Sequence, residues 1–252
     1  MKNVAIEIKN LNKWFGPTQA LKNISFSIKK NEVLALLGDN GAGKSTLIKA
    51  MSGAENFTDG QIFINNEPIC TKKYGVKLAR ERGIETVYQS DSLGEQQNIW
   101  RNLFLGRHLR NRFGFIDSKE EKRQADLLLK TLNFNGIGAT IETEAKLLSG
   151  GERQGLAIGR AMLFDAKVVI LDEPTTALSL GEVEKVLCFI ETLKAQHRAC
   201  LLITHNLNDA YRVADRFLIL DHGTIVAEHV KSEISQPELQ QSILNCVGRG
   251  LL

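Results

Sequence analysis

Residues 38–45 read Gly-Asp-Asn-Gly-Ala-Gly-Lys-Ser and fit the pattern G-x-x-x-x-G-K-[ST]. The run before them, Val33–Leu37, is entirely apolar, which predicts a strand buried on both faces of a parallel sheet. The run after them, Ser45–Met51, has the apolar spacing of a helix. Between such elements, glycines let backbone N–H groups converge on an anion, and the helix N-terminus adds positive potential. The stretch therefore predicts a phosphate-binding loop in an α/β domain, and an ordinary Gly-rich turn is the less favoured alternative.

The polar side chains of this loop have distinct expected roles toward a nucleotide. Lys44 is expected to contact the β- and γ-phosphates, Ser45 to ligate Mg²⁺, and Thr46 to hydrogen-bond the α-phosphate. The residues expected to bind the nucleotide through this loop are Gly38, Asn40, Gly41, Ala42, Gly43, Lys44, Ser45 and Thr46.

Two carboxylates follow a second apolar run, Val168–Leu171, which also predicts a buried strand. Open α/β sheets bind ligands at the carboxyl ends of their strands, so Asp172 and Glu173 are expected near the phosphates. Asp172 is assigned to Mg²⁺, and Glu173 is assigned to the water that attacks the γ-phosphate. The alternative is a pair of acids that caps the next helix before Pro174, and the Gly-rich loop makes it less favoured.

A third motif identifies the family. Residues 148–154, Leu-Ser-Gly-Gly-Glu-Arg-Gln, resemble the signature motif of ABC ATPases and precede the carboxylate strand, as they do in that family. Three single residues also match family positions in order, namely an aromatic that stacks on adenine (Phe15), the Q-loop glutamine (Gln89) and the switch histidine (His205). Alone, each of these is unremarkable, and their order along nearly the whole chain carries the resemblance.

The resemblance implies one ABC nucleotide-binding domain over residues 1–252. Its fold would be that of an α/β P-loop NTPase with a RecA-like parallel-sheet core, an antiparallel β subdomain and a helical subdomain. The core with its β subdomain is expected over 1–90 and 163–252, and the helical subdomain over 91–162. Within these, Gly60–Ile69 predicts a hairpin around Asn65-Asn66, and Ser118 with Glu121 forms a capping-box pattern that predicts a helix start.

The resemblance also implies a role for each matching residue, with ATP and Mg²⁺ as ligands. Gln89 would touch Mg²⁺ or the attacking water and sense the transporter, and His205 would hydrogen-bond the γ-phosphate. The signature would close over the γ-phosphate of ATP held by a second subunit, through Ser149, Gly150, Gly151 and Glu152. Because one chain has one phosphate loop and one signature, a head-to-tail dimer of two copies with two shared sites is implied.

Two positions depart from the family pattern. Glu152 stands where Gln is most familiar, and its charge is expected to weaken closure modestly, with Arg153 as an offset. Ser179 stands where the D-loop usually has Asp, which removes a carboxylate that contacts the opposite subunit. Ser149 with Glu152, and Ser179 with Glu182, each form the S-x-x-E pattern of a capped helix start.

Within the family the chain resembles the ATPases of carbohydrate importers through Gly83–Gln89 and Asn102–Arg107, although Arg101 replaces a Glu usual there. This implies permease subunits and a solute-binding protein as partners. The alternative is a soluble ABC protein that acts on DNA or ribosomes, which would carry coiled-coil insertions, zinc hooks or tandem copies.

Charge and hydropathy favour the transport reading. The net charge of +3 gives little support for binding of nucleic acid. No secretory signal and no run of about eighteen apolar residues is found, so a membrane role is expected through a partner. Four cysteines without metal-ligand spacing favour a reducing compartment. The expected location is therefore peripheral, at the cytoplasmic face of the cell membrane.

Overall fold

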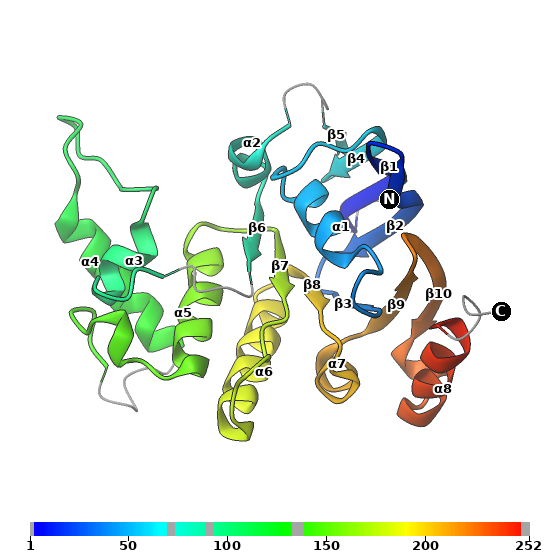
Figure 1. Cartoon of the computed structure of the whole chain (residues 1–252). Helices are drawn as coiled ribbons and strands as arrows, with labels where there is room; N and C mark the ends of the chain where they lie inside the picture. Colours follow the sequence, from blue (N-terminus) through cyan, green and yellow to red (C-terminus); the bar gives the residue numbers. More distant parts are fainter. Residues whose placement is uncertain (1–2, 70–73, 89–92, 133–138, 248–252) are drawn as a thin grey trace.

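The computed structural model describes residues 3–69, 74–88, 93–132 and 139–247 (Figure 1). Gln89, expected in the Q-loop, lies outside these ranges. None of the helices described combines the length and apolar character that a bilayer crossing requires.

The larger sheet has six strands, of which five run parallel. The sixth, β10, is antiparallel to its neighbour β9. The predicted strands Val33–Leu37 and 168–171 are the neighbours of the central strand β8, which they flank. Across the sheet the strands are β10 (Thr224–Val230), β9 (Arg216–Asp221), β3 (Val33–Leu37), β8 (Ala199–Ile203), β7 (Val168–Asp172) and β6 (Ile84–Val87).

Both faces of this sheet are covered, which explains the unbroken apolar runs. In β3 the side chains of Val33, Ala35 and Leu37 join one hydrophobic cluster, whereas Leu34 and Leu36 join another on the opposite face. The first cluster includes helices α5 (Gly150–Leu163), α6 (Leu180–Ala195) and α7 (Leu207–Val213). The second includes α1 (Lys44–Met51) and the smaller sheet. Successive strand residues point to opposite faces, so a doubly covered strand must be apolar at every position.

The smaller sheet is antiparallel and contains the predicted hairpin. Asn65 and Asn66 form its turn with φ of 50° and 67°, a backbone conformation that Asn tolerates better than most residues. The hairpin prediction is thus confirmed. The strands lie in the order β2 (Thr18–Lys29), β1 (Val4–Phe15), β4 (Asp59–Ile64) and β5 (Glu67–Pro68).

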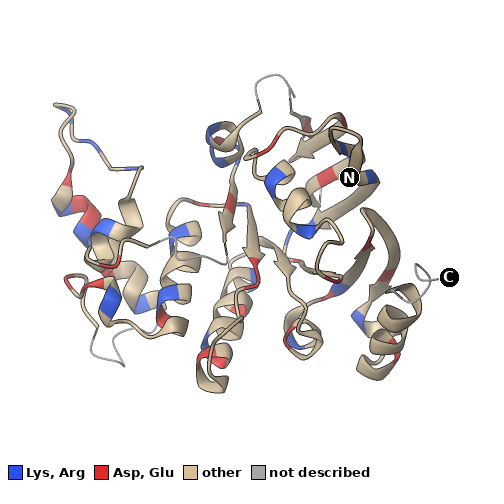
Figure 2. Ribbon diagram, in the orientation of Figure 1, with Lys and Arg blue, Asp and Glu red and all other residues tan. Residues whose placement is uncertain are grey.

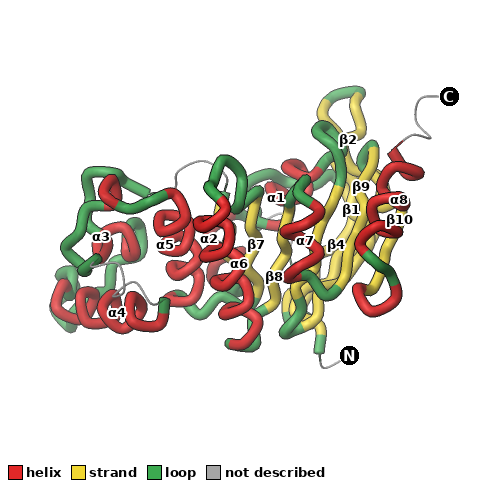
Figure 3. Tube along the Cα trace, turned by 90° about the horizontal axis from the view of Figure 1, so that it is seen from below, coloured by secondary structure: helices red, strands yellow, loops and turns green. Residues whose placement is uncertain are grey.

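Helices α3 (Ile99–Phe104), α4 (Ser118–Thr131) and α5 gather at one end of the molecule, away from the small sheet (Figure 3). The 3₁₀ helix η3 (Ala145–Leu147) precedes α5. The mixed sheets and covering helices confirm the predicted fold class, while the exact division at residues 90/91 and 162/163 stays a prediction. The remaining helices are α2 (Val76–Glu81), η4 (Lys231–Glu233) and α8 (Gln236–Val247).

The start of α4 differs from the prediction by one residue. Asp117, not Ser118, is the N-cap, and its Oδ1 accepts a hydrogen bond from the Glu120 N–H at 3.1 Å. Glu121 does not close a capping box, because its side chain is fully buried and accepts from the Leu109 N–H at 2.8 Å. Asp caps helices as well as Ser does, so two adjacent cap residues left the register ambiguous in the sequence.

Positive and negative side chains are interspersed along the same elements (Figure 2). On α4, for example, Arg123 pairs with Glu120, and Lys130 with Asp126 at 2.6 Å. Such pairs are typical of a solvated helix face rather than of a surface for nucleic acid.

Candidate functional site

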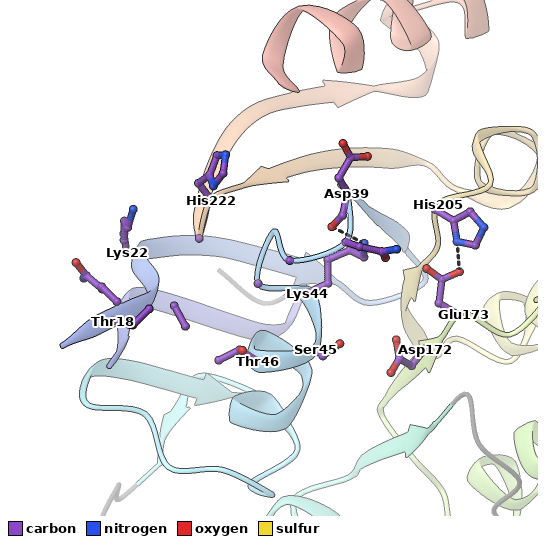
Figure 4. A pocket seen from close by; sticks show the side chains of 16 residues that line it. Thr18, Lys22, Asp39, Lys44, Ser45, Thr46, Asp172, Glu173, His205 and His222 are labelled. Carbon is purple, nitrogen blue, oxygen red and sulfur yellow. Dashed lines mark hydrogen bonds and ion pairs between the residues drawn. The ribbon is translucent and has the colours of Figure 1, made fainter. Parts of the chain in front are cut away.

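A pocket of about 770 Å³ lies at the carboxyl ends of β3, β7 and β8, where the phosphate loop, the carboxylates and the histidine meet (Figure 4). The chain segments that form it are far apart in the sequence, and the parallel sheet brings them to one edge. Its lining residues are Thr18, Gln19, Ala20, Lys22, Asp39, Asn40, Gly41, Gly43, Lys44, Ser45, Thr46, Asp172, Glu173, His205, His222 and Gly223.

The loop backbone requires glycine at Gly38, where the chain passes against β9. A Cβ at this position would lie 2.3 Å from the carbonyl oxygen of Leu220, which is far inside van der Waals contact. The loop then leads directly into α1, whose N-cap is Gly43 and whose first turn contains no acidic residue. Free N–H groups at a helix start without a competing acid form an anion-binding position.

Lys44 is buried and turned toward its own loop. Its ammonium donates to the carbonyl oxygens of Gly38 at 2.5 Å and Asp39 at 3.0 Å. Both acceptors are neutral carbonyl oxygens, so they compensate for only part of the lost hydration of the charged ammonium. Lys44 also lines the pocket, where it is available to a phosphate.

Asp172 ends β7 and its side chain extends toward Ser45 across the pocket (Figure 4). Burial raises the pKa of this carboxyl; the neighbouring Glu173 raises it further, and Lys44 opposes both. A cation between Asp172 and Ser45 would stabilise the ionised form of this buried carboxyl. A carboxylate and a hydroxyl are hard oxygen ligands, so the two residues fit Mg²⁺.

Glu173 is held in a strained backbone conformation with φ of 50°, in the left-handed region. Its N–H donates to the Ile203 carbonyl at 2.9 Å, and its Oε2 accepts from the Thr176 hydroxyl at 3.2 Å. The same Oε2 lies 2.8 Å from Nδ1 of His205. The sequence placed both residues near the phosphates but did not predict this direct contact, which depends on the register between β7 and β8.

Six of the eight predicted phosphate-loop residues line this pocket, whereas Gly38 and Ala42 of the loop and Phe15 at its rim do not. Gly38 and Ala42 lie behind the lining, where Gly38 accepts from Lys44 and the Ala42 carbonyl accepts from the Gly223 N–H at 2.8 Å. Phe15 pairs with Thr18, a lining residue, at the end of the β1–β2 hairpin. Its ring is 46% exposed and lies 4.6 Å from the Lys13 ammonium, so it is available at the rim.

The sequence reasoning missed the contribution of β2 and of the β9–β10 turn. His222 and Gly223 form this turn with φ of 43° and 77°, and both line the pocket. The Lys22 N–H donates to the Gly223 carbonyl at 2.7 Å, which joins the turn to β2. His and Gly both adopt positive φ more readily than most residues, so the pair fits a turn, but only the fold reveals which site this turn approaches.

The signature residues lie outside this pocket, at the N-terminus of α5. Ser149 is the N-cap: its Oγ accepts from the Glu152 N–H at 3.3 Å, and Glu152 accepts in return from the Ser149 N–H at 3.0 Å. The capping box is therefore confirmed. The cation beside Glu152 is Lys185 at 3.0 Å, whereas Arg153, the expected offset, donates to the Leu148 carbonyl at 2.8 Å. Lys185 comes from α6, so the sequence did not indicate this ion pair, and the offset by Arg153 stays a prediction.

A glycine-rich loop after a parallel strand, a helix N-terminus without acids and two carboxylates at the end of another strand of the same sheet define a P-loop nucleotide-binding protein. The profile of the ABC transporter family matches residues 21–176. The chain therefore belongs to the ABC transporter family.

Relatives and solved structures agree with this assignment. The xylose/arabinose import ATP-binding protein XylG of Sulfolobus acidocaldarius is 39% identical over 236 residues, 94% of this chain and 92% of XylG. An ATP-binding cassette of an ABC transporter, MJ1267, superposes with a TM-score of 0.84 at 25% identity and covers 98% of both chains. A dimeric cassette, MJ0796 in a post-hydrolysis state with ADP and Pi, superposes with a TM-score of 0.74 at 25% identity, covering 90% of this chain and 98% of that one. Several other relatives named for sugar import are about twice as long, and the chain spans between 44% and 47% of them.

Proposed function

We propose that this chain is the ATP-binding and ATP-hydrolysing subunit of an ABC importer for carbohydrates. The observation that carries the proposal is the convergence of Lys44, Ser45, Asp172, Glu173 and His205 on one pocket. Their chemistry matches phosphoryl transfer to water, which depends on positioning and on neutralising charge.

Each residue has a step that follows from its observed contacts. Lys44 exchanges the Gly38 and Asp39 carbonyls for the β- and γ-phosphates, a replacement that turns neutral acceptors into charged ones. Ser45 and Asp172 hold Mg²⁺, which neutralises phosphate charge when bound. Glu173 orients the attacking water or accepts its proton, and His205 supports the carboxylate through Nδ1 or turns to the γ-phosphate.

The site is completed by a second copy of the chain in this proposal. The signature donors lie on a separate helix N-terminus outside the pocket, so one subunit alone does not direct them at its own nucleotide. The dimeric form of the related cassette MJ0796 supports a dimer, and the head-to-tail arrangement with two shared sites is part of the proposal. The isolated subunit is accordingly expected to turn over ATP slowly.

Carbohydrate import is supported by the printed names of several relatives, which include import of xylose and arabinose, allose and ribose. The partners are then permease subunits and, in the whole complex, a solute-binding protein. The chain would sit at the cytoplasmic face of the membrane through these partners. No relative reported above is named for action on DNA or ribosomes, so this alternative receives no support.

The decisive experiment is purification of tagged Glu173→Gln protein in mild detergent with Mg-ATP, followed by mass spectrometry of the proteins that co-purify. A multi-spanning permease, with or without a sugar-binding protein, is the expected result. Lys44→Ala serves as the matched control, because a subunit that does not bind ATP should lose partners that depend on the closed dimer. Recovery of ribosomal proteins or DNA factors in place of a permease would overturn the transport assignment.

A further inference from the structure

One carboxylate, Glu182 in the first turn of α6, joins the N-termini of two helices. Its Oε1 accepts from the Gly151 N–H at 3.1 Å, on α5. Its Oε2 accepts from the Ser179 N–H at 3.0 Å and the Ser179 hydroxyl at 2.8 Å. All of these partners are neutral donors.

The hydrogen bonds from Ser179 and Gly151 lower the pKa of Glu182 to about 2. The group therefore carries a full negative charge at any pH at which the protein functions. Among the described residues, no cation lies within ion-pair distance of it, while the neighbouring Lys185 is directed to Glu152. Glu182 is thus an uncompensated anion at the start of α5.

Packing holds the carboxylate in this position. A Cβ on Gly151 would lie 2.8 Å from Cβ and 3.0 Å from Cα of Glu182, so the two helices approach at a distance that only glycine permits. The contact is therefore between helix backbones as well as between polar groups. A side chain at 151 would push α6 away from the signature.

The donors that Glu182 uses are the ones that the signature is proposed to offer to a phosphate. A helix N-terminus with a serine hydroxyl is an anion site, and here a carboxylate of the same chain is the anion. A γ-phosphate held by the second subunit must compete with Glu182 for the Gly151 N–H.

We propose that Glu182 is a positioning residue that acts as an internal competitor for the γ-phosphate and opposes closure of the ATP-bound dimer. This inference rests on the proposed function, because it assumes that the signature binds nucleotide across a dimer. On closure, Oε1 leaves Gly151 while Oε2 keeps its bonds to Ser179. Glu182 therefore couples the N-cap of α6, Ser179 in the predicted D-loop, to the binding of a γ-phosphate at the signature.

The test compares Glu182→Gln with the parent in a Glu173→Gln background, where hydrolysis is blocked. The measurement is the ATP concentration at which half of the protein is dimeric. Sedimentation velocity at fixed protein concentration determines the dimeric fraction. Removing the charge while keeping the side-chain shape should lower this concentration about tenfold, the size of effect expected for one charge-assisted hydrogen bond. The advantage should shrink as ionic strength rises.

Glu184→Gln is the matched control, since Glu184 lies on the same helix but pairs with Arg212. It should leave the half-maximal ATP concentration unchanged. A fluorescent ATP analogue bound to dilute monomers gives a second measurement, and its affinity for the chain's own pocket should be the same in all three proteins. Thermal unfolding establishes that each variant is folded.

The outcomes separate the two hypotheses. If the parent shows no ATP-dependent dimer, the proposed function fails, and this inference fails with it. If the parent dimerises and Glu182→Gln needs the same or more ATP, only the competitor role is overturned. An equal change in monomer affinity would also overturn it, because the residue would then act through the pocket.

Discussion

The molecule presents two helix N-termini of similar design and opposite electrostatics. At α1, Gly43 precedes a first turn without acids, and Lys44 provides a cation. At α5, Ser149 and two glycines are followed by Glu152, and Glu182 reaches in from α6. The first is prepared to receive phosphate, whereas the second is already occupied by a carboxylate. The difference teaches that the same local geometry becomes a binding site or a resting contact according to the charges packed around it.

The largest expected effect is on the first of these sites. Lys44→Ala removes the cation of α1 and should reduce ATP turnover about a hundredfold or more, because charge neutralisation is the main contribution to phosphoryl transfer. Steady-state ATPase assays and calorimetric titration of ATP measure turnover and binding. Lys49→Ala, at an exposed position in the last turn of the same helix, is the control and should behave as wild type. A Lys44→Ala protein with normal turnover would contradict the comparison.

Glu173→Gln should separate binding from chemistry at the same site. The amide cannot accept the proton of water, so turnover should fall about a hundredfold to a thousandfold while ATP affinity is retained. Phosphate release in single-turnover assays, together with equilibrium ATP binding, distinguishes the two quantities. Thr176→Val, which removes only the 3.2 Å hydrogen bond to Glu173, should have a much smaller effect. Rapid steady turnover by Glu173→Gln would require another group to be the base.

The second N-terminus can be tested by stability. Gly151→Ala places a methyl group against α6 and should lower the free energy of unfolding by about 1–3 kcal/mol, the usual cost of overpacking. Gly181→Ala is the matched control on α6, where a Cβ meets nothing within 4 Å. It should raise the free energy of unfolding by about 0.4–1 kcal/mol by restricting the unfolded chain. Urea unfolding curves measure both, and equal effects at the two positions would show that α5 and α6 are not in close contact.

The smallest expected effect concerns pH at the first site. The pKa of Asp172 is raised by burial, so the carboxylate is lost on acidification at a higher pH than that of an exposed Asp, whose pKa is about 3.9. Because Mg²⁺ binds the ionised form, the Mg²⁺ concentration for half-maximal activity should begin to rise as the pH falls into this range. Activity titrations with Mg²⁺ at several pH values test this. Asp172→Asn should have lost this pH dependence, and a wild-type profile as flat as that of the variant would argue against Asp172 as the ligand.

Folded-state stability without nucleotide should change in the opposite direction. A raised pKa in the native state means that the folded protein binds the proton more tightly than the unfolded chain does. The burial of Asp172 therefore costs stability above its native pKa, and this cost is relieved as the pH falls toward the unfolded value. Thermal unfolding of wild type and Asp172→Asn across this window reports the difference.

The two regions also differ in how far the sequence predicted them. The phosphate loop is one continuous stretch between a buried strand and a helix, so local pattern placed Lys44 and Ser45 correctly in the pocket. The surroundings of the signature depend on α6, about thirty residues later in the chain. Periodicity predicts that α6 is a helix but not which of its residues faces α5. For this reason Lys185 and Glu182 were not assigned as partners of the signature.

Long-range register explains the other gaps. The contact between Glu173 and His205 depends on the pairing of β7 with β8, and the approach of His222 to the pocket depends on the pairing of β3 with β9. Both pairings join segments far apart in the sequence. The shifted cap of α4 has a local cause, since Asp117 and Ser118 are both good cap residues. Gln89 retains its predicted role as an expectation, because it lies outside the described ranges.

The left-handed backbone of Glu173 has a consequence for the history of the chain. Gly or Asn would adopt φ of 50° at lower energetic cost, so selection for fold stability alone would have replaced this glutamate. Its presence marks a stability–function trade-off, in which the fold tolerates local strain in order to present a carboxylate at the pocket. A redesign that optimises stability alone at this position would relieve the backbone strain and remove the carboxylate from the pocket.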